Sequence, residues 1–181
     1  MAKGPDVRLA HVGIYVTDIR KMEAFYTRFF NFTVTDRGML SQTELVFLSR
    51  DPDEHHQLVL ATGRPANLSF NIVNQISFRV PSLGDLRTLH ARLADEPVSE
   101  IRPVSHGNAW SVYFRDPEGT RLELYLDTPW YINQPIREPL DLSQPDEAIL
   151  SETERLCRAS PGFRPHADWR ADVARRMGLA H

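Results

Sequence analysis

The chain has 181 residues, a formal net charge of -3 and an apolar fraction of 41%, which suits one domain of ordinary size with an appendage. Its basic residues are scattered, apart from the pair Arg175 and Arg176, so we expect no nucleic-acid partner. No apolar run approaches the roughly 18 residues of a membrane-spanning helix, and the first ten residues lack the apolar middle of a signal peptide, so we expect a cytoplasmic protein without membrane contact.

Two stretches of the chain repeat each other. Residues 11–29 align without a gap with residues 75–93, so that His11 falls on Gln75. Each copy is expected to begin with an alternating strand, a helix cap and an amphipathic helix. The expected strands and caps are residues 12–16 and Asp18 in the first copy, and residues 76–80 and Ser82 in the second.

Each copy also ends alike, with a strand, an Asp-Pro turn and a final strand. Aligning the final strands LVLAT and LYLDT puts Gln57 on Glu123. The repeating unit is therefore a βαβββ module, whose own helix leaves the inner face of its sheet uncovered. We expect an α+β fold in which two paired βαβββ modules form a curved, cupped mixed sheet around a central cleft.

The module pattern ends near Asp127. We expect one domain over residues 1–128, with modules at 8–62 and 73–128, and a tail over residues 129–181. Four prolines between positions 129 and 145 favour an extended strap.

Two short helices should follow the strap. One is expected after a Ser143 cap with Pro145 in its first turn, and the other from near Pro165 to Gly178. They would close the cleft mouth or contact a second subunit of a homodimer. The single cysteine, Cys157, has no activating partner in the pattern.

The stretch HVGIYVTD from His11 and the stretch YFRDPEGTRLELY from Tyr113 resemble the vicinal oxygen chelate superfamily over residues 9–127. That superfamily includes glyoxalase I, methylmalonyl-CoA epimerase, fosfomycin-resistance and bleomycin-binding proteins, and the extradiol dioxygenases. Its metal ligands come from the first and last strands of the modules. The resemblance implies a metal site on His11, Gln57, Gln75 and Glu123.

The resemblance is strongest to the extradiol dioxygenase branch. It implies Fe(II), with Mn, Ni, Co or Zn as alternatives, and cleavage of an aromatic diol by O2. It also implies that His56 is an acid and base near the bound oxygen, and that His106 and Tyr113 bind the substrate hydroxyl. A histidine of near-neutral pKa suits such proton transfer.

Several residues depart from that pattern. Gln75 stands where these dioxygenases have a second histidine, and Gln57 replaces an acidic ligand of glyoxalase I. An amide oxygen still binds a hard divalent ion. Strict strand alternation would turn His56 away from the face of Gln57, and a bulge would reconcile the two. His55 and His56 otherwise read as exposed loop histidines.

Three functions therefore stay open. The first is a metal-dependent extradiol-type dioxygenase. The second is a glyoxalase or epimerase type of metal-dependent isomerase or lyase. The third is a metal-free small-molecule-binding protein, which the two neutral amides favour. In each case residues 37–42 and 63–70 are expected to be loops that set the size of the cleft.

Overall fold

Each copy of the repeat forms a unit of its own in the computed structural model, which describes residues 7–65, 67–68 and 70–179. The two units are Met1–Ile72 and Val73–His181. No helix among these described residues is long and apolar enough to cross a membrane.

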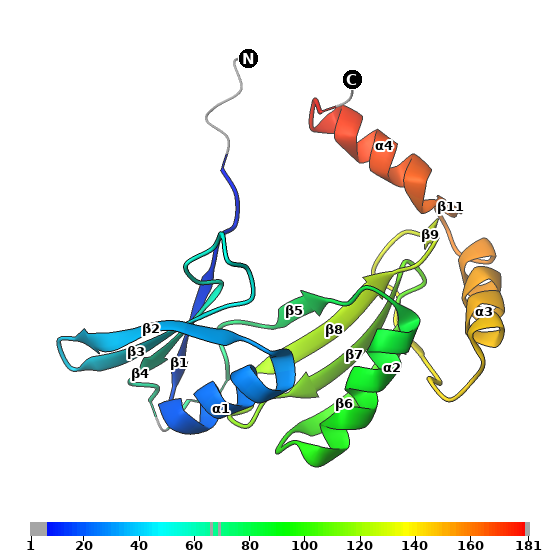
Figure 1. The fold of residues 1–181 in the computed structure, drawn as a ribbon. Helices are drawn as coiled ribbons and strands as arrows, with labels where there is room; N and C mark the ends of the chain where they lie inside the picture. Colours follow the sequence, from blue (N-terminus) through cyan, green and yellow to red (C-terminus); the bar gives the residue numbers. More distant parts are fainter. Residues whose placement is uncertain (1–6, 66, 69, 180–181) are drawn as a thin grey trace. The chain divides into compact units, whose positions relative to one another are not determined.

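The first unit is a four-stranded sheet with one helix against it (Figure 1). Its elements are β1 (Val12–Val16), α1 (Ile19–Phe30), β2 (Thr33–Leu40), β3 (Thr43–Ser49) and β4 (Leu58–Thr62). The strand order is β1-β4-β3-β2, with β1 parallel to β4 and the other neighbours antiparallel. This arrangement confirms the first βαβββ module.

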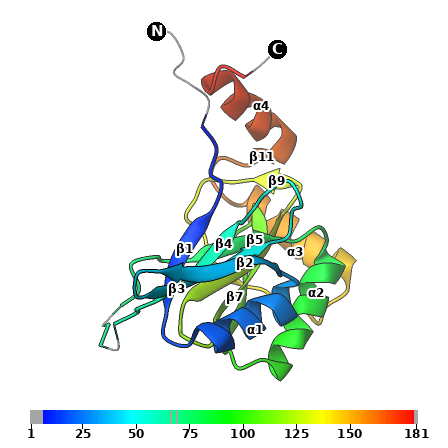
Figure 2. The ribbon, with the colours of Figure 1, turned by 60° about the vertical axis from the view of Figure 1, so that its left-hand side comes forward.

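Helix α1 begins and ends as the sequence predicts. The Asp18 carboxylate accepts a hydrogen bond from the Lys21 backbone at 3.0 Å and so caps the first turn. Asn31 ends the helix in the left-handed region at φ 57°. The apolar face of α1 is rich in aromatic side chains. The helix packs on β3 and β4 (Figure 2). The core of this unit therefore lies between α1 and the sheet.

The second unit repeats the same chain path. Its corresponding elements are β5 (Ile76–Arg79), α2 (Leu83–Arg92), β6 (Ser99–Ser105), β7 (Ala109–Arg115) and β8 (Arg121–Asp127). A short 3-10 turn, Leu93–Asp95, follows α2. The order β6-β7-β8-β5 matches β2-β3-β4-β1, and β5 is parallel to β8. The expected Ser82 cap is present, since its hydroxyl accepts from the Asp85 backbone.

Strand pairing corrects one alignment between the modules. In the second unit Glu123 lies opposite Ser77, and in the first unit the residue at the corresponding position, opposite Gly13, is Val59 rather than Gln57. The two alignments differ by two residues, and a shift of two leaves every side chain on the same face of a strand. Alternation alone could not separate them.

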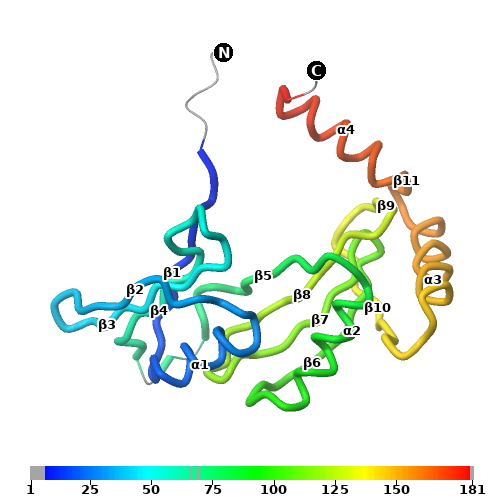
Figure 3. Tube along the Cα trace, in the orientation of Figure 1, coloured from blue at the N-terminus to red at the C-terminus, as the bar shows by residue number. Residues whose placement is uncertain are grey.

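The remaining elements of the second unit follow β8. They are β9 (Trp130–Tyr131), β10 (Glu138–Pro139), α3 (Asp146–Arg158), β11 (Arg164–Pro165) and α4 (His166–Arg176). Strand β10 extends the sheet beside β6, and β11 pairs with β9 (Figure 3).

The C-terminal helices agree with prediction except at one cap. Helix α4 starts after Pro165, and Gly178 follows its C-cap with φ 67°. Helix α3 starts after Pro145, without a side-chain cap. The Ser143 cap is therefore wrong, because that hydroxyl donates to Asp141 at 2.6 Å instead.

The expected loop over residues 37–42 is also wrong. Residues up to Leu40 belong to β2, and only a tight turn at Ser41 and Gln42 joins it to β3. Ser41 takes a positive φ of 55° there. Exposed polar residues along β2 hid the strand pattern, since seven of its eight positions are exposed and no buried face alternates. In the expected loop over residues 63–70, positions 66 and 69 lie outside the described residues.

Candidate functional site

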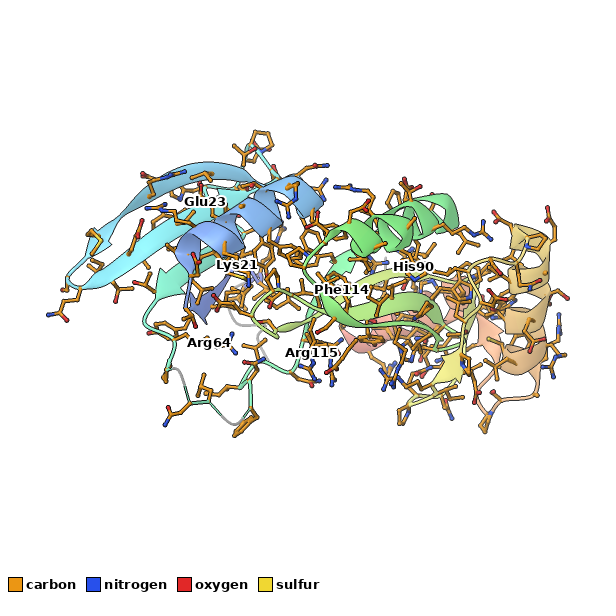
Figure 4. The ribbon with its side chains drawn as sticks, turned by 90° about the horizontal axis from the view of Figure 1, so that it is seen from below. Lys21, Glu23, Arg64, His90, Phe114 and Arg115 are labelled. Carbon is orange, nitrogen blue, oxygen red and sulfur yellow. The ribbon has the colours of Figure 1, made fainter. Side chains whose placement is uncertain are left out.

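The sheet of the second unit separates an apolar face from a polar one. Phe114, Leu122 and Leu124 are buried on the face that α2 covers. Tyr113 and Glu123 are directly opposed across β7 and β8 and occupy the other face. Successive residues of a strand point to opposite faces, as Phe114 and its neighbour Arg115 do in Figure 4.

Glu123 is a buried carboxylate, 7% exposed, that three neutral groups hold. Ser111 Oγ donates to Oε1 at 2.7 Å, while Ser77 Oγ donates to Oε2 at 2.5 Å. Gln75 Nε2 also donates to Oε2, at 2.8 Å. No cationic side chain among the described residues of the second unit lies within ion-pair distance of Glu123, so these donors offset the cost of burying its charge.

His106 and Tyr113 form a hydrogen-bonded pair in the same unit. His106 Nε2 lies 3.0 Å from the Tyr113 hydroxyl, and Nδ1 lies 2.5 Å from the Ile136 carbonyl oxygen. A carbonyl only accepts, so Nδ1 carries the hydrogen, and Nε2 of an imidazole in that tautomer accepts from the Tyr113 hydroxyl. The Ile136 carbonyl thus fixes both the tautomer and the orientation of the ring.

The Tyr113 phenol is held in its neutral form. Burial first, and then the neighbouring Glu123 carboxylate, raise the pKa of Tyr113 to about 12, while the positive charge of Arg137 opposes the shift. The phenol, which any tyrosine keeps protonated at neutral pH, here stays protonated into the alkaline range and can act as a donor.

The first unit holds a separate histidine cluster. The rings of His11 and His56 lie 4.2 Å apart between centroids, and His56 also contacts Phe47 at 5.1 Å. His55 Nδ1 lies 2.8 Å from His56 Nδ1, so one of these nitrogens donates to the other. Phe47 alternates with buried Val46 and Leu48, which places the cluster on the sheet face away from α1.

Burial first, and then the charges of His11 and His55, lower the pKa of His56, while Glu54 opposes them. The neutral imidazole is thereby favoured, and its Nε2 atom remains for proton exchange. Residues 55–57 precede β4, so strand alternation does not apply to them. The β3–β4 pairing among the described residues runs without a register shift, so it contains no bulge that would reconcile the faces of Gln57 and His56.

Gln57 forms hydrogen bonds with neighbouring backbone groups. Its side-chain Oε1 accepts from the Arg50 backbone N–H at 3.1 Å, and its backbone carbonyl accepts from Val12. A ligand role for Gln57 would require the hydrogen bond to Arg50 to open. The internal repeat no longer supports that role, because Val59 occupies the position equivalent to Glu123.

The structure brings the predicted residues together in two groups. Gln75, Glu123, Tyr113 and His106 gather in the second unit, and His11 with His56 in the first. Within each unit, the described residues include no group of three or more His, Cys, Asp or Glu side chains that could hold a metal ion.

Sequence reasoning missed the two serines that hold Glu123. Ser77 lies two positions after Gln75, and Ser111 two positions before Tyr113. Residues two apart on a strand share a face. Small polar side chains beside an inward-facing Glu were thus a readable signal. The Ile136 carbonyl could not be found this way, because it comes from an irregular segment.

Comparisons with known proteins match most of the chain to one superfamily. A model of the Glyoxalase/Bleomycin resistance protein/Dioxygenase superfamily matches residues 8–124. Biphenyl-2,3-diol 1,2-dioxygenase 3 of Rhodococcus globerulus is 30% identical over 125 residues, 66% of this chain and 63% of that protein. Biphenyl-2,3-diol 1,2-dioxygenase 2 of the same organism is 26% identical over 146 residues, 78% of this chain and 67% of that protein. The chain thus spans about two thirds of the length of these relatives.

Solved structures share the fold. A glyoxylase/bleomycin resistance protein/dioxygenase domain from Frankia sp. EAN1pec is 25% identical with a TM-score of 0.59, covering 68% of this chain and all of that one. The fosfomycin resistance protein FosX from Listeria monocytogenes, solved with Mn(II) and sulfate, is 22% identical with a TM-score of 0.53, covering 71% of this chain and 95% of that one. Glyoxalase I from Leishmania major is also 22% identical, with a TM-score of 0.54 over 66% of this chain and 86% of that one.

Proposed function

The chain belongs to the glyoxalase, bleomycin resistance protein and dioxygenase superfamily, and from that premise we propose that it is a metal-dependent extradiol-type dioxygenase. Its substrate would be a catecholic compound whose ring is cleaved beside the diol with O2. Two relatives named as biphenyl-2,3-diol dioxygenases support this branch of the superfamily. The observation that carries the proposal is the hydrogen bond between His106 and Tyr113 next to the buried Glu123.

The metal ligands that we propose are His11, Gln75 and Glu123, with Gln57 as an additional candidate. The Gln75 amide lies 2.8 Å from Glu123 Oε2, so these two side chains would hold one ion together if the amide turned to present its oxygen. An imidazole nitrogen, an amide oxygen and a carboxylate together suit a divalent ion, and we propose Fe(II).

A metal held by these residues would supply Lewis acidity toward a diol and redox chemistry with dioxygen. The rest of the chemistry falls to the protein. Nε2 of His106 accepts a hydrogen bond, and its anchored ring can orient a diol hydroxyl in place of or beside the Tyr113 hydroxyl. When a diol hydroxyl takes its place at His106, the Tyr113 phenol is free to donate its one hydrogen to a substrate oxygen that carries negative charge, and its raised pKa disfavours loss of that proton.

His56 is the residue that we propose as the proton acceptor. Its lowered pKa keeps the ring neutral, so that Nε2 can take the proton of a diol hydroxyl and later return it. In the overall reaction one ring C–C bond breaks, and both atoms of O2 enter the ring-opened product. No other reductant is consumed.

A metal-free binding protein is the second candidate, and one observation favours it. Both oxygens of Glu123 already accept hydrogen bonds from neutral donors, which stabilises a carboxylate without any cation. In this alternative Gln75 stays a donor to Glu123. The polar face of the sheet would then bind a ligand without transforming it.

Subunit number is part of the proposal. We propose a homodimer, because Met177 and Leu179 at the end of the chain are about 60% exposed and none of the described residues of α4 is buried. A second copy would cover this apolar surface. Light scattering on the purified protein measures the mass of the particle directly, and a monomer at micromolar concentration would contradict the dimer.

Anaerobic Fe(II) binding tests the metal site. The wild-type chain should bind one Fe(II), and His11→Ala and Glu123→Ala should each abolish that binding. Glu147→Ala, which removes an exposed carboxylate from α3, is the matched control and should bind iron like the wild type. Unchanged iron stoichiometry in His11→Ala and Glu123→Ala would contradict the assignment of these residues as metal ligands.

The same variants separate the two candidate functions. A dioxygenase loses oxygen uptake with catechol and 2,3-dihydroxybiphenyl when Glu123 is removed. A metal-free binding protein consumes no oxygen, and its affinity for these diols changes little in His11→Ala. Failure of the wild type to hold any divalent ion would favour the binding protein.

A further inference from the structure

A small basic pocket opens on the polar face of the second unit, beside Tyr113. Its volume is about 80 Å³. Tyr113 forms one wall, and the charged residues that line it are Glu100, Arg102, Arg115, Arg121 and Arg137. The proposed function assigns no role to any of these arginines.

Strand register gathers the arginines on one face. Arg102 lies opposite Tyr113 across β6 and β7, and Arg115 lies opposite Arg121 across β7 and β8. Directly opposed residues project to the same face, as do residues two apart on one strand. Arg102, Arg115 and Arg121 therefore share the face of Tyr113. Arg137 comes from the segment after β9, and its guanidinium carbon lies 5.0 Å above the centre of the Tyr113 ring.

Positive charge exceeds negative charge in the pocket. Glu100, at a register shift in β6 with a positive φ of 54°, pairs with Arg115 at 2.7 Å. Arg121 donates to the neutral Asn74 side chain at 3.3 Å. Among the described residues, no carboxylate lies within ion-pair distance of Arg102, Arg121 or Arg137. Like charges crowded into one pocket repel each other, and a bound anion would relieve that repulsion.

We propose that this pocket binds a carboxylate substituent of the diol, so that the substrate class is a catechol with a carboxylate side chain. The inference rests on the proposed dioxygenase function for the diol part only. Tyr113 lies both at the proposed diol site and at the basic pocket, because its hydroxyl is hydrogen-bonded to His106 while its ring faces Arg137. The planar guanidinium fork matches a carboxylate with two parallel hydrogen bonds.

The size of the pocket also favours a carboxylate. About 10–15 Å³ of cavity space holds one water molecule, so 80 Å³ admits a group of a few heavy atoms. A carboxylate fits this space, whereas an apolar phenyl substituent would leave the guanidinium groups without partners. Desolvating a charged group without a partner is costly.

Binding of a carboxylate without a diol tests the pocket separately from catalysis. Calorimetry with the purified protein should show 3-phenylpropionate binding at least tenfold more tightly than 3-phenylpropan-1-ol, which has no charge. Arg102→Gln and Arg137→Gln should each weaken the carboxylate about tenfold, since a hydrogen bond to a charged group contributes one to two powers of ten. Arg137→Lys, which keeps the charge, should lose less.

Arg170→Gln is the matched control, because Arg170 is exposed on α4, and its affinity should equal that of the wild type. Arg137 lies outside the helices and long strands, so its variants keep the test informative if Arg102→Gln fails to fold. Phenylphosphonate supplies a second anion. Binding of phenylphosphonate with no binding of 3-phenylpropionate would overturn the carboxylate assignment.

Turnover separates this inference from the proposed function. With Fe(II) present, 3-(2,3-dihydroxyphenyl)propionate should be cleaved with a kcat/KM at least tenfold above that of 3-propylcatechol, and Arg137→Gln should remove the difference. Equal cleavage of both catechols by wild type and variant would overturn the pocket and leave the dioxygenase standing. Arginine-dependent carboxylate binding without any oxygen uptake would uphold the pocket and overturn the dioxygenase.

Discussion

The two units follow one chain path, yet they place different chemistry on the sheet face away from the helix. At the equivalent positions on the last two strands, the first unit pairs Phe47 with Val59, and the second pairs Tyr113 with Glu123. The topology accepts an apolar pair or a polar pair equally well. Function in this fold is therefore carried by individual face positions and not by the architecture.

The largest expected effect comes from making the second unit resemble the first. Tyr113→Phe installs the side chain that the first unit has at this position and removes the hydroxyl partner of His106. The kcat for diol cleavage should fall roughly 100-fold or more, since positioned proton transfer contributes about 10²- to 10⁴-fold. Steady-state oxygen uptake measures this loss.

The control for that variant is Tyr131→Phe, because Tyr131 stacks on Trp169 and not on His106. Its kcat should stay within about twofold of the wild type, as expected for a change away from the reacting groups. Wild-type turnover in Tyr113→Phe, with the fold intact by circular dichroism, would contradict a role for the phenol.

The helices offer a comparison of stability. Phe25 on α1 and Leu89 on α2 occupy equivalent positions of the repeat, but Phe25 is buried and Leu89 is only half-buried. Phe25→Ala should lower the free energy of unfolding by about 4 kcal/mol, and Leu89→Ala by about 1 to 2 kcal/mol. Urea denaturation measures both, and equal losses would show that the two helices contribute alike.

The helix caps should behave alike in the two units. Asp18 and Ser82 each accept a hydrogen bond from a backbone N–H in the first turn. Replacement of either by Ala should lower the free energy of unfolding by about 1 kcal/mol. An unchanged unfolding midpoint in one variant would mean that solvent replaces that cap without cost.

The smallest expected effect is a dependence of stability on alkaline pH. The pKa of Tyr113 is raised to about 12 in the folded protein, above its value of about 10 in an unfolded chain. The resulting stabilisation is complete below pH 10 and is lost as the pH rises toward 12. Denaturation midpoints between pH 8 and 11 should therefore fall more steeply for the wild type than for Tyr113→Phe. Parallel curves would show that Glu123 and burial do not hold the proton.

Local rules predicted much of the frame. Alternation of apolar residues predicted β1, and the Asp18 and Ser82 caps predicted where α1 and α2 begin. The internal repeat predicted the second module. The rules failed where a choice depends on distant partners. The loop between β3 and β4 decides that Val59, and not Gln57, corresponds to Glu123, and a two-residue shift leaves no trace in hydrophobic period.

In the candidate site, too, some residues could be predicted from the sequence and others depend on distant partners. Strand alternation singled out Glu123, an acid between two leucines. Tyr113 and His106 were identified only through the resemblance to the extradiol dioxygenases. The tautomer of His106 depends on the Ile136 carbonyl, which carries no side-chain signal. The arginines beside Tyr113 come from three strands and one irregular segment, so only the strand register could assemble them.

The most direct test of the central claim is the isotope content of the product formed from catechol and ¹⁸O₂ by the Fe(II)-loaded protein. The account predicts a ring-opened product that carries both oxygen atoms of one O2 molecule, and its loss in Tyr113→Phe. Iron and catechol bound together without oxygen uptake, or a product labelled only from water, would contradict it.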